Sequence, residues 1–415
     1  MNVVIIGNSA AGLSGLEAFR KHDQASQMTI IAKEGQRPYS RVLLPYYLRG
    51  KVPHEHLFVR EQDYYEQLNA TCVNGTVIRL LVEQQRVQLA DQTMLPYDKL
   101  LIATGASPVK PPIPGLSGDG IHHLWTLEDV GKLKRYYKEG NRVVVLGSGF
   151  VSLQGACAAL SCGLNVSVIE LANRIMPKAL DERGANILAS RMKEMGVDLR
   201  VNTLTTHIER NTDKKYKLFF KDGGSLTADF IIVGTGVQPN IDFLEDTTIK
   251  IDAGIIVNER METSLRGIYA AGDVAQVPSF TGGDPVVHAL WPTAVETGGV
   301  AGRCMASSCT PYKGSLNMNV TQMFGLTVAS MGNYIEGEGC ERWLDESLAD
   351  NQYMAIVLKG GVPIGATCVG SSELVSTLGM LRPLIREKVR IEGKPDMLKA
   401  MMAQNISHHH HAFVK

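Results

Sequence analysis

Residues Val3–Gly12 have the sequence VVIIGNSAAG. Its apolar, β-branched first part predicts a buried strand, and the residues that follow, 13–21, predict a helix. A second strand is predicted over 28–32, shortly before Glu34. A strand, a glycine-rich turn, a helix and another strand form the start of a βαβ nucleotide-binding fold.

The same order of elements returns in RVVVLGSGFVS, residues Arg142–Ser152. A strand over 142–146, a helix over 153–161 and a strand over 165–169 are predicted around this loop. The chain therefore contains two nucleotide-binding folds. The loop 108–120 between them is rich in proline and glycine, which is typical of a crossing between domains.

Further strands follow the second fold. Residues 227–236 predict strands that close it, whereas 268–273 predict a buried strand that presents Asp273 at its carboxyl end and returns the chain to the first domain. After Tyr312 the pattern predicts a separate α+β unit, with strands over 317–320, 327–332, 353–359 and 362–369 and a helix over 371–386.

Composition narrows the possible partners. The 415 residues include 42 Lys plus Arg and 42 Asp plus Glu. The net charge is therefore zero, and no overall electrostatic field favours binding to nucleic acid or to an anionic membrane. Small molecules or other proteins are the expected partners. The chain runs from Met1 directly into a strand pattern, without a signal-peptide pattern or an apolar run of membrane-spanning length, so a cytoplasmic protein is predicted.

The seven cysteines are scattered and never occur as Cys-x-x-Cys, so a reducing compartment and no metal site are predicted. Cys157 and Cys162 are five residues apart, as are Cys304 and Cys309, each pair on a predicted helix. Since residues five apart share a helix face poorly, both pairs are predicted to be buried structural cysteines. The run His408–His411 is expected to be a solvated tail.

A glycine-rich turn lets the backbone approach a pyrophosphate, and the free amides at the helix N-terminus stabilise its charge. Ser9 replaces the second glycine of the first loop, so a simple tight turn remains an alternative there. In the second fold Glu170 follows the loop by about 20 residues, where an acid accepts from a ribose 2′-hydroxyl. It would repel a 2′-phosphate, and Arg174 is the nearby cation, so NADH is favoured over NADPH. Glu34 is the matching acid of the first fold, with a solvated loop acid as the alternative.

Five ordered motifs, Gly7–Gly12, Ala103–Gly105, Gly147–Ser152, Val233–Gly236 and Ala271–Asp273, resemble those of the FAD/NAD pyridine nucleotide–disulfide reductase superfamily. The resemblance covers nearly the whole chain and implies an α/β fold with two Rossmann-like domains and a C-terminal α+β domain. It also implies that the chain binds FAD and NAD(H). Asp273 would bind the ribityl chain of FAD, although a helix cap is the alternative.

On this basis the FAD-binding domain is predicted to be discontinuous, comprising 1–112 and 242–315. The NAD-binding domain is inserted over 113–241. The C-terminal α+β domain, 316–415, is predicted to form an interface, either in a homodimer or in a hetero-oligomeric complex.

The segment 37–48 looks like its counterpart in rubredoxin reductases, ferredoxin reductases and NADH-dependent nitrite reductases. This resemblance places Arg41 and Pro45 beside the flavin and its phosphates, with a surface arginine as the alternative. Disulfide reductases of the superfamily have a redox cysteine in this segment, and this sequence has none. The stretch His288–Glu296 resembles the one whose backbone amides face the flavin pyrimidine. Trp291, within this stretch, is as well explained as a packing residue.

Gln154 stands where the family commonly has a glutamate that shapes the nicotinamide pocket. Hydride chemistry belongs to the cofactors, so no catalytic acid or base is predicted. The predicted FAD contacts are Gly7, Ser9, Ala10, Ala11, Gly12, Glu34, Arg41, Pro45, Val77, Ala103, Thr104, Gly105, Gly272, Asp273, Trp291, Thr293 and Ala294. The predicted NAD contacts are Gly147, Gly149, Phe150, Val151, Gln154, Glu170 and Gly236.

These features predict an FAD-dependent NADH:acceptor oxidoreductase. Without a redox cysteine in the segment 37–48, the electron partner is expected to be external, either a small redox protein such as rubredoxin or ferredoxin, or an iron–sulfur subunit. The second arrangement resembles flavoprotein subunits of 2-oxoacid oxidoreductases of the phenylglyoxylate dehydrogenase kind. Two alternatives remain, an NADH oxidase or small-molecule reductase that acts alone, and a non-catalytic redox-sensing flavoprotein whose second site has degenerated.

Overall fold

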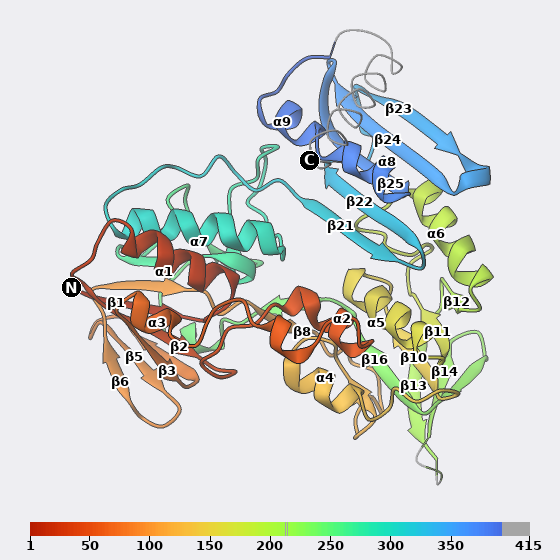
Figure 1. Ribbon diagram of the computed structural model, residues 1–415, viewed down its shortest axis with the longest axis horizontal. Coiled ribbons are helices and arrows are strands. Elements are labelled where there is room, and N and C mark those ends of the chain that lie inside the picture. Colours follow the sequence, from red (N-terminus) through yellow and green to blue (C-terminus); the bar gives the residue numbers. More distant parts are fainter. Residues whose placement is uncertain (212, 214, 392–415) are drawn as a thin grey trace, which may run out of the picture. The chain divides into compact units, whose positions relative to one another are not determined.

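The computed structural model describes residues 1–211, 213 and 215–391, and these form two compact units (Figure 1). Unit 1 combines residues 1–109 with 237–316, and unit 2 combines residues 110–236 with the described residues from 317 onward. The chain thus leaves the first unit and later returns to it. The predicted division into three domains is finer than these two units and stays a prediction.

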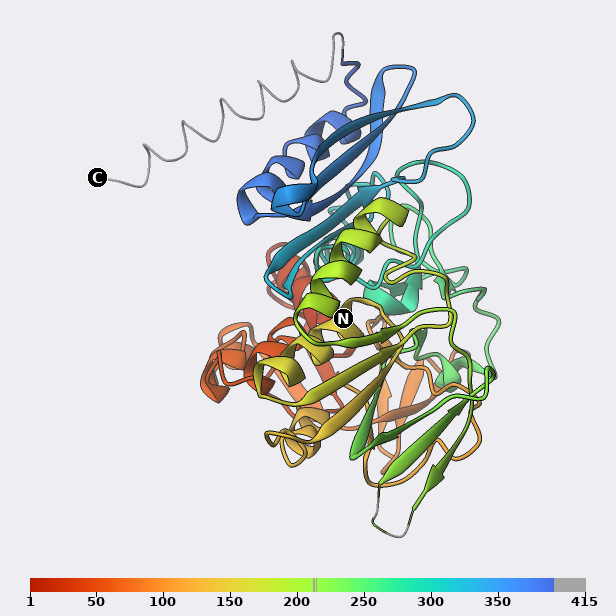
Figure 2. The same ribbon diagram turned by 90° about the vertical axis from the view of Figure 1, so that its right-hand side faces the viewer.

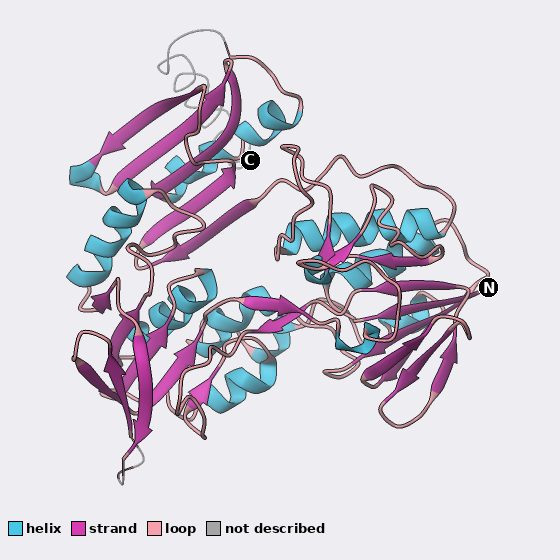
Figure 3. Ribbon diagram, turned by 180° about the vertical axis from the view of Figure 1, so that it is seen from behind, coloured by secondary structure: helices cyan, strands magenta, loops and turns pink. Residues whose placement is uncertain are grey.

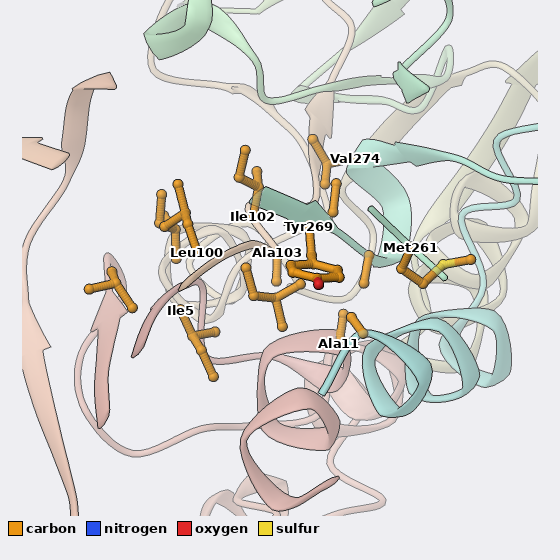
Figure 4. Packing of buried hydrophobic residues seen from close by; sticks show 14 of the residues in the cluster. Ile5, Ala11, Leu100, Ile102, Ala103, Met261, Tyr269 and Val274 are labelled. Carbon is orange, nitrogen blue, oxygen red and sulfur yellow. The ribbon is translucent and has the colours of Figure 1, made fainter. Parts of the chain in front are cut away.

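Unit 1 is built on a parallel sheet with the strand order β19-β7-β1-β2-β3. Helices α1 (Ala10–Arg20) and α7 (Trp291–Met305) pack side by side (Figure 1). Figure 4 shows the buried core around Ile5, Leu100 and Tyr269. The strands are β1 (Asn2–Ile6), β2 (Gln27–Ala32), β3 (Ala70–Asn74), β7 (Lys99–Ile102) and β19 (Ile268–Ala270).

Smaller elements complete unit 1, including an antiparallel sheet of β4, β5 and β6. Two further pairs are β8 with β17 and β18 with β20. These elements are α2 (Leu44–Leu48), α3 (Tyr64–Gln67), β4 (Val77–Leu81), β5 (Arg86–Leu89), β6 (Met94–Pro96), β8 (Ala106–Pro108), β17 (Val237–Pro239), β18 (Ile255–Ile256) and β20 (Ala275–Gln276).

Unit 2 contains the second nucleotide-binding fold, a parallel sheet with the order β12-β11-β10-β16-β9. An antiparallel sheet of β13, β14 and β15 lies in the same unit. The elements are β9 (Ile121–His122), α4 (Leu127–Leu133), β10 (Arg142–Leu146), α5 (Phe150–Ser161), β11 (Asn165–Ile169), α6 (Glu182–Glu194), β12 (Asp198–Arg200), β13 (Thr205–Arg210), β14 (Tyr216–Phe220), β15 (Ser225–Ala228) and β16 (Phe230–Val233).

The C-terminal part of unit 2 is an antiparallel sheet with the order β21-β22-β25-β24-β23. Its strands are among those drawn in magenta in Figure 3. Figure 2 shows helix α6 beside this sheet, and α6 contacts β24 and β25. Two short helices also contact the sheet. The elements are β21 (Met318–Met323), β22 (Leu326–Gly332), β23 (Cys340–Ser347), β24 (Gln352–Lys359), β25 (Val362–Gly370), α8 (Ser372–Leu378) and α9 (Leu381–Arg386).

Two sequence predictions for this sheet are wrong. Strand β23 was not predicted because its sequence, CERWLDES, is largely polar. It is an edge strand in which no residue is fully buried, whereas most of its neighbour β24 is buried. The single helix predicted over 371–386 is two helices, α8 and α9. Pro383 lacks an amide hydrogen and lies in the first turn of α9, a position where a helix tolerates proline. In one continuous helix over 371–386 it would lie in the interior, where proline breaks the helix.

The prediction for Cys304 and Cys309 is also wrong, because the two residues form a disulfide. Helix α7 ends at Met305, and Ser307 has a left-handed backbone with φ +63°. The chain therefore turns back toward Cys304 instead of continuing as a helix. Cys157 and Cys162 are not joined by a disulfide, and Cys157 is buried. The run His408–His411 lies outside the described residues.

Candidate dinucleotide-binding sites

The first glycine loop joins β1 to α1 in unit 1. Gly7 has φ +111°, and a Cβ added there would lie 2.2 Å from the Ala103 carbonyl oxygen. Helix α1 begins at Ala10, so Gly12 falls in its first turn, where an added Cβ would lie 1.8 Å from the Gly7 oxygen. Both positions therefore require glycine. The loop leaves the first amides of α1 free of helical partners, as anion binding requires.

Three separate segments of unit 1 meet at this loop. A Cβ added to Gly272 would lie 2.9 Å from the Ala11 Cβ and 3.5 Å from the Ala294 Cβ. One added to Gly298 of α7 would lie 2.2 Å from the Ala11 oxygen. The first turn of α1, the turn before Asp273 and helix α7 are thus closely packed against one another. They meet beyond the carboxyl ends of the parallel strands, where open α/β sheets bind their ligands.

Asp273 lies in this junction, directly after Gly272, which has φ +75°. Burial raises the pKa of Asp273 to about 6, and the positive charge of Arg41 partly opposes this shift. The carboxylate is therefore kept close to a cation in a site with restricted access to water. Trp291, the first residue of α7, is partly buried against the unit 1 core, while Thr293 and Ala294 are buried in the same first turn of the helix.

Two neighbouring side chains hold Glu34 in place. Its carboxylate accepts hydrogen bonds from the Tyr39 hydroxyl and from the Arg41 guanidinium. The side chains of Arg41 and Glu34 are 30% and 33% exposed, so both retain access to a ligand. Tyr39 was not predicted from the sequence, because a tyrosine in a proline-containing loop carries no distinct signal.

The turn over Ala103–Gly105 is fixed by Asn240, a second residue that the sequence analysis missed. The Thr104 hydroxyl donates to the Asn240 carbonyl at 2.9 Å, and the Asn240 side-chain amide donates to the Thr104 carbonyl at 2.8 Å. Gly105 has φ +66°. Among the other predicted contacts, Pro45 is buried in α2 and Val77 is the first residue of β4.

These features fit FAD. Gly7 and Gly12 provide a backbone surface from which side chains are sterically excluded, and α1 presents its amino end there. An acid at Glu34 can accept from a ribose, and Asp273 can accept from hydroxyls of the ribityl chain. The structure brings together the predicted residues of the α1 loop, the Asp273 turn and α7; their contacts with FAD stay predictions.

The second glycine loop joins β10 to α5 in unit 2. Gly147 has φ +94°, and a Cβ added there would lie 2.5 Å from the Gly234 oxygen. Ser152 donates its hydroxyl to the same Gly234 carbonyl at 2.8 Å. The serine at the third glycine position therefore replaces bare backbone packing with a hydrogen bond. Gly149 stands directly before α5, whose first residues are Phe150 and Val151. This geometry fits a second dinucleotide.

Glu170 follows β11 and reaches back to this loop. One carboxylate oxygen accepts from the Ser148 hydroxyl at 2.5 Å, and the other accepts from the Ala172 amide at 2.8 Å. Ser148 also accepts from the Met176 amide at 3.1 Å, so it positions the acid; the sequence analysis missed this role. Arg174 donates to the carbonyls of Pro177 and Leu180, each at 3.3 Å.

Gln154 is buried on α5, and its side-chain amide donates to the Thr321 hydroxyl and to the Gln322 carbonyl at 3.0 Å. Both partners lie on β21. The donor end of Gln154 thus links the second nucleotide-binding fold to the C-terminal sheet, a contact that sequence reasoning did not anticipate. Gly236, the last predicted NAD contact, has φ +116° and open space at its Cβ position.

Comparison with known proteins agrees with this geometry. The profile of the pyridine nucleotide-disulphide oxidoreductase family matches residues 1–298. Two similar proteins are the epsilon subunit of NADH-dependent phenylglyoxylate dehydrogenase from Aromatoleum evansii, 32% identical over 81% of this chain and 80% of that protein, and an NADH oxidase from Methanocaldococcus jannaschii, 31% identical over 80% and 76%. A chain in the solved covalent complex of putidaredoxin reductase and putidaredoxin superimposes with a TM-score of 0.87 and 26% identity, over 96% of this chain and 95% of that one.

The chain belongs to the pyridine nucleotide-disulphide oxidoreductase family. The predicted class, an oxidoreductase that uses FAD and NAD(H), is confirmed, as is the predicted α/β fold with a C-terminal sheet. Within the described part of the chain, no helix is long and apolar enough to cross a membrane. The same residues contain no cluster of three or more His, Cys, Asp or Glu side chains suited to a metal ion.

Proposed function

We propose that this protein is an NADH:acceptor oxidoreductase in which unit 1 holds FAD, the second nucleotide-binding fold holds NAD(H), and the electrons pass to an external redox protein or iron–sulfur subunit. The observation that carries this proposal is the pair of glycine loops. In each loop a glycine lies too close to a neighbouring backbone oxygen for any side chain, and an acidic residue, Glu34 or Glu170, follows the next strand of the same fold. The bound cofactors supply the hydride chemistry. The residues of the chain bind them and set their electrostatic surroundings.

The contacts of Glu170 support NADH as the preferred nucleotide. Its carboxylate is held by Ser148 and by a backbone amide, in position to accept from a ribose 2′-hydroxyl. A 2′-phosphate would meet this negative charge. Arg174, the nearby cation, is occupied with backbone carbonyls of its own loop. We therefore expect a lower KM for NADH than for NADPH.

Arg41 and the amino end of α7 support the flavin chemistry. Arg41 brings a positive charge to both Glu34 and Asp273. Helix α7 is 15 residues long and adds the positive end of its dipole at Trp291. Both favour negative charge on a bound cofactor, whether on phosphate or on a reduced isoalloxazine ring.

An external electron partner is supported by the cysteines. The segment 37–48, where disulfide reductases of the superfamily have a redox cysteine, contains none. The one disulfide among the described residues, Cys304–Cys309, lies at the far end of α7 from Trp291. We propose that the partner is a small redox protein or an iron–sulfur subunit, in a homodimer or a larger complex, and we retain the prediction of a cytoplasmic location.

A second candidate, an NADH oxidase that reduces oxygen directly, is favoured by the similarity to the Methanocaldococcus jannaschii protein. A test of the electron acceptor separates the two. The purified, FAD-loaded protein is given NADH with either a one-electron dye or dissolved oxygen, and NADH consumption is followed. Fast consumption with the dye and slow consumption with oxygen supports an external one-electron partner. Oxygen consumption that matches the dye rate would overturn that part of the proposal in favour of the oxidase.

A further inference from the structure

One buried side chain joins the Asp273 turn to helix α7. Thr297 lies in the first half of α7 and is fully buried. Its hydroxyl oxygen accepts from the Gly272 backbone amide at 3.0 Å. The same hydroxyl donates to the Thr293 carbonyl at 2.7 Å, one turn earlier in the helix. A single hydroxyl thus links the residue before Asp273 to the turn that contains Thr293.

The direction of both bonds follows from the partners. The Gly272 amide has only a hydrogen to offer, and the Thr293 carbonyl only lone pairs. The hydroxyl must therefore accept from the first and donate to the second. A side chain at position 297 must therefore be short and must both accept and donate a hydrogen bond. Only threonine and serine meet this requirement. Valine has the same shape but leaves a buried amide hydrogen without its partner.

The junction around Thr297 leaves little room for compensation. Gly272 has φ +75°, and a Cβ there would approach both Ala11 and Ala294. Gly298, the next residue of α7, is in contact with the Ala11 backbone. If the turn lost its bond to Thr297, Gly272 could find a new partner only by moving against these close neighbours.

We infer that Thr297 is a positioning residue of the FAD site, which fixes the Asp273 carboxylate relative to the amino end of α7. The inference rests on the proposed function, since it assumes that FAD occupies this junction. Asp273 and the α7 dipole are the two electrostatic features that face the junction from these segments. Thr297 holds them in one fixed arrangement, so its loss alters FAD affinity and the reduction potential of the bound flavin together.

Thr263 offers a matched control. It is also a buried threonine of unit 1, and its hydroxyl likewise accepts from one backbone group and donates to another, the Leu265 amide at 3.1 Å and the Leu265 carbonyl at 3.2 Å. Its own amide donates to Ile268, at the amino end of β19. Gly272 follows the carboxyl end of the same strand. Thr263→Val therefore removes equivalent bonds away from the junction.

The test compares Thr297→Val, Thr297→Ser and Thr263→Val in the full-length protein, by FAD titration of flavin-free protein and by spectroelectrochemistry after loading. Thr297→Val is expected to weaken FAD binding roughly tenfold, the cost of one buried unsatisfied donor. It should also make the flavin potential more negative, because the α7 dipole stabilises a reduced flavin less well. Thr297→Ser should retain the wild-type values, and Thr263→Val should lower thermal stability alone.

If Thr297→Val does not fold, Thr297→Ala removes the same bonds with a smaller side chain. It should also show weaker FAD binding and a more negative flavin potential. Wild-type affinity and potential in the folded Val or Ala variant would overturn the inference. If Thr263→Val changed the FAD affinity and the flavin potential as much as Thr297→Val does, the inference would also be overturned, because the changes would reflect a general loss of stability. A wild-type protein that binds no FAD would instead overturn the proposed function itself.

Discussion

Replacing Asp273 with asparagine is expected to stabilise the flavin-free protein while weakening its affinity for FAD. Burial raises the pKa of Asp273 from 3.8 to about 6. Because the folded-state pKa lies above the unfolded value, the charge destabilises the fold as the pH rises from about 4 to 6. One pKa unit corresponds to about 1.4 kcal/mol, so the shift sets an upper limit of about 3 kcal/mol on the gain above pH 6.

The assay is thermal unfolding of flavin-free Asp273→Asn and wild-type protein at several pH values. The melting temperatures of the two proteins should agree near pH 4. Between pH 4 and pH 6 the variant should become increasingly more stable than wild type, and above pH 6 the difference in melting temperature should stay constant. FAD affinity should fall about tenfold, because a bond to a charged acceptor is lost. The exposed Asp284, replaced by Asn, is the control and should change neither value. A variant that is less stable than wild type at pH 8, or a gap independent of pH, would refute the reasoning.

Three further predictions concern the glycine loops and the cysteines. Gly12→Ala should abolish FAD binding, because its Cβ would lie 1.8 Å from the Gly7 oxygen, whereas Gly131→Ala on α4, with open space at that position, should bind FAD normally in the same titration. Ser148→Ala should raise the KM for NADH about fivefold by releasing Glu170, without changing FAD affinity; an unchanged KM would show that the hydroxyl does not position the acid. Alkylation of unfolded, unreduced protein should label five cysteines and leave Cys304 and Cys309 unlabelled until a reductant is added, whereas seven labels before reduction would rule out the disulfide.

Much of the fold was predictable because its signals are local. The strand and glycine loop at Val3–Gly12 and their repeat at Arg142–Ser152 depend on backbone sterics, which the residue types report directly. The edge strand β23 was missed because a strand with no fully buried residue needs no apolar pattern. The Cys304–Cys309 disulfide was missed because the end of α7 depends on the conformation of Ser307, which the spacing of the cysteines does not reveal.

The site residues were predictable only where each one lies within, or directly beside, a recognisable sequence motif. Glu34, Glu170 and Asp273 follow strands at expected positions, and the structure gives each a defined setting. Thr297 acts on a residue that is distant in sequence, because it bonds to Gly272, 25 positions earlier, and no local pattern records such a contact. Tyr39 is only five positions from its partner Glu34, but a tyrosine in a proline-containing loop carries no distinct signal. Gln154 was predicted from the resemblance alone, and its contact with β21 depends on the packing of the C-terminal sheet.

The most direct test of the central claim is an anaerobic titration of the FAD-loaded protein with NADH, followed by the visible absorbance of the flavin. We expect the absorbance to bleach with one NADH consumed per flavin, because a hydride carries two electrons and the flavin accepts both. An unchanged absorbance at excess NADH would contradict it and would show that the second nucleotide-binding fold does not deliver electrons to FAD.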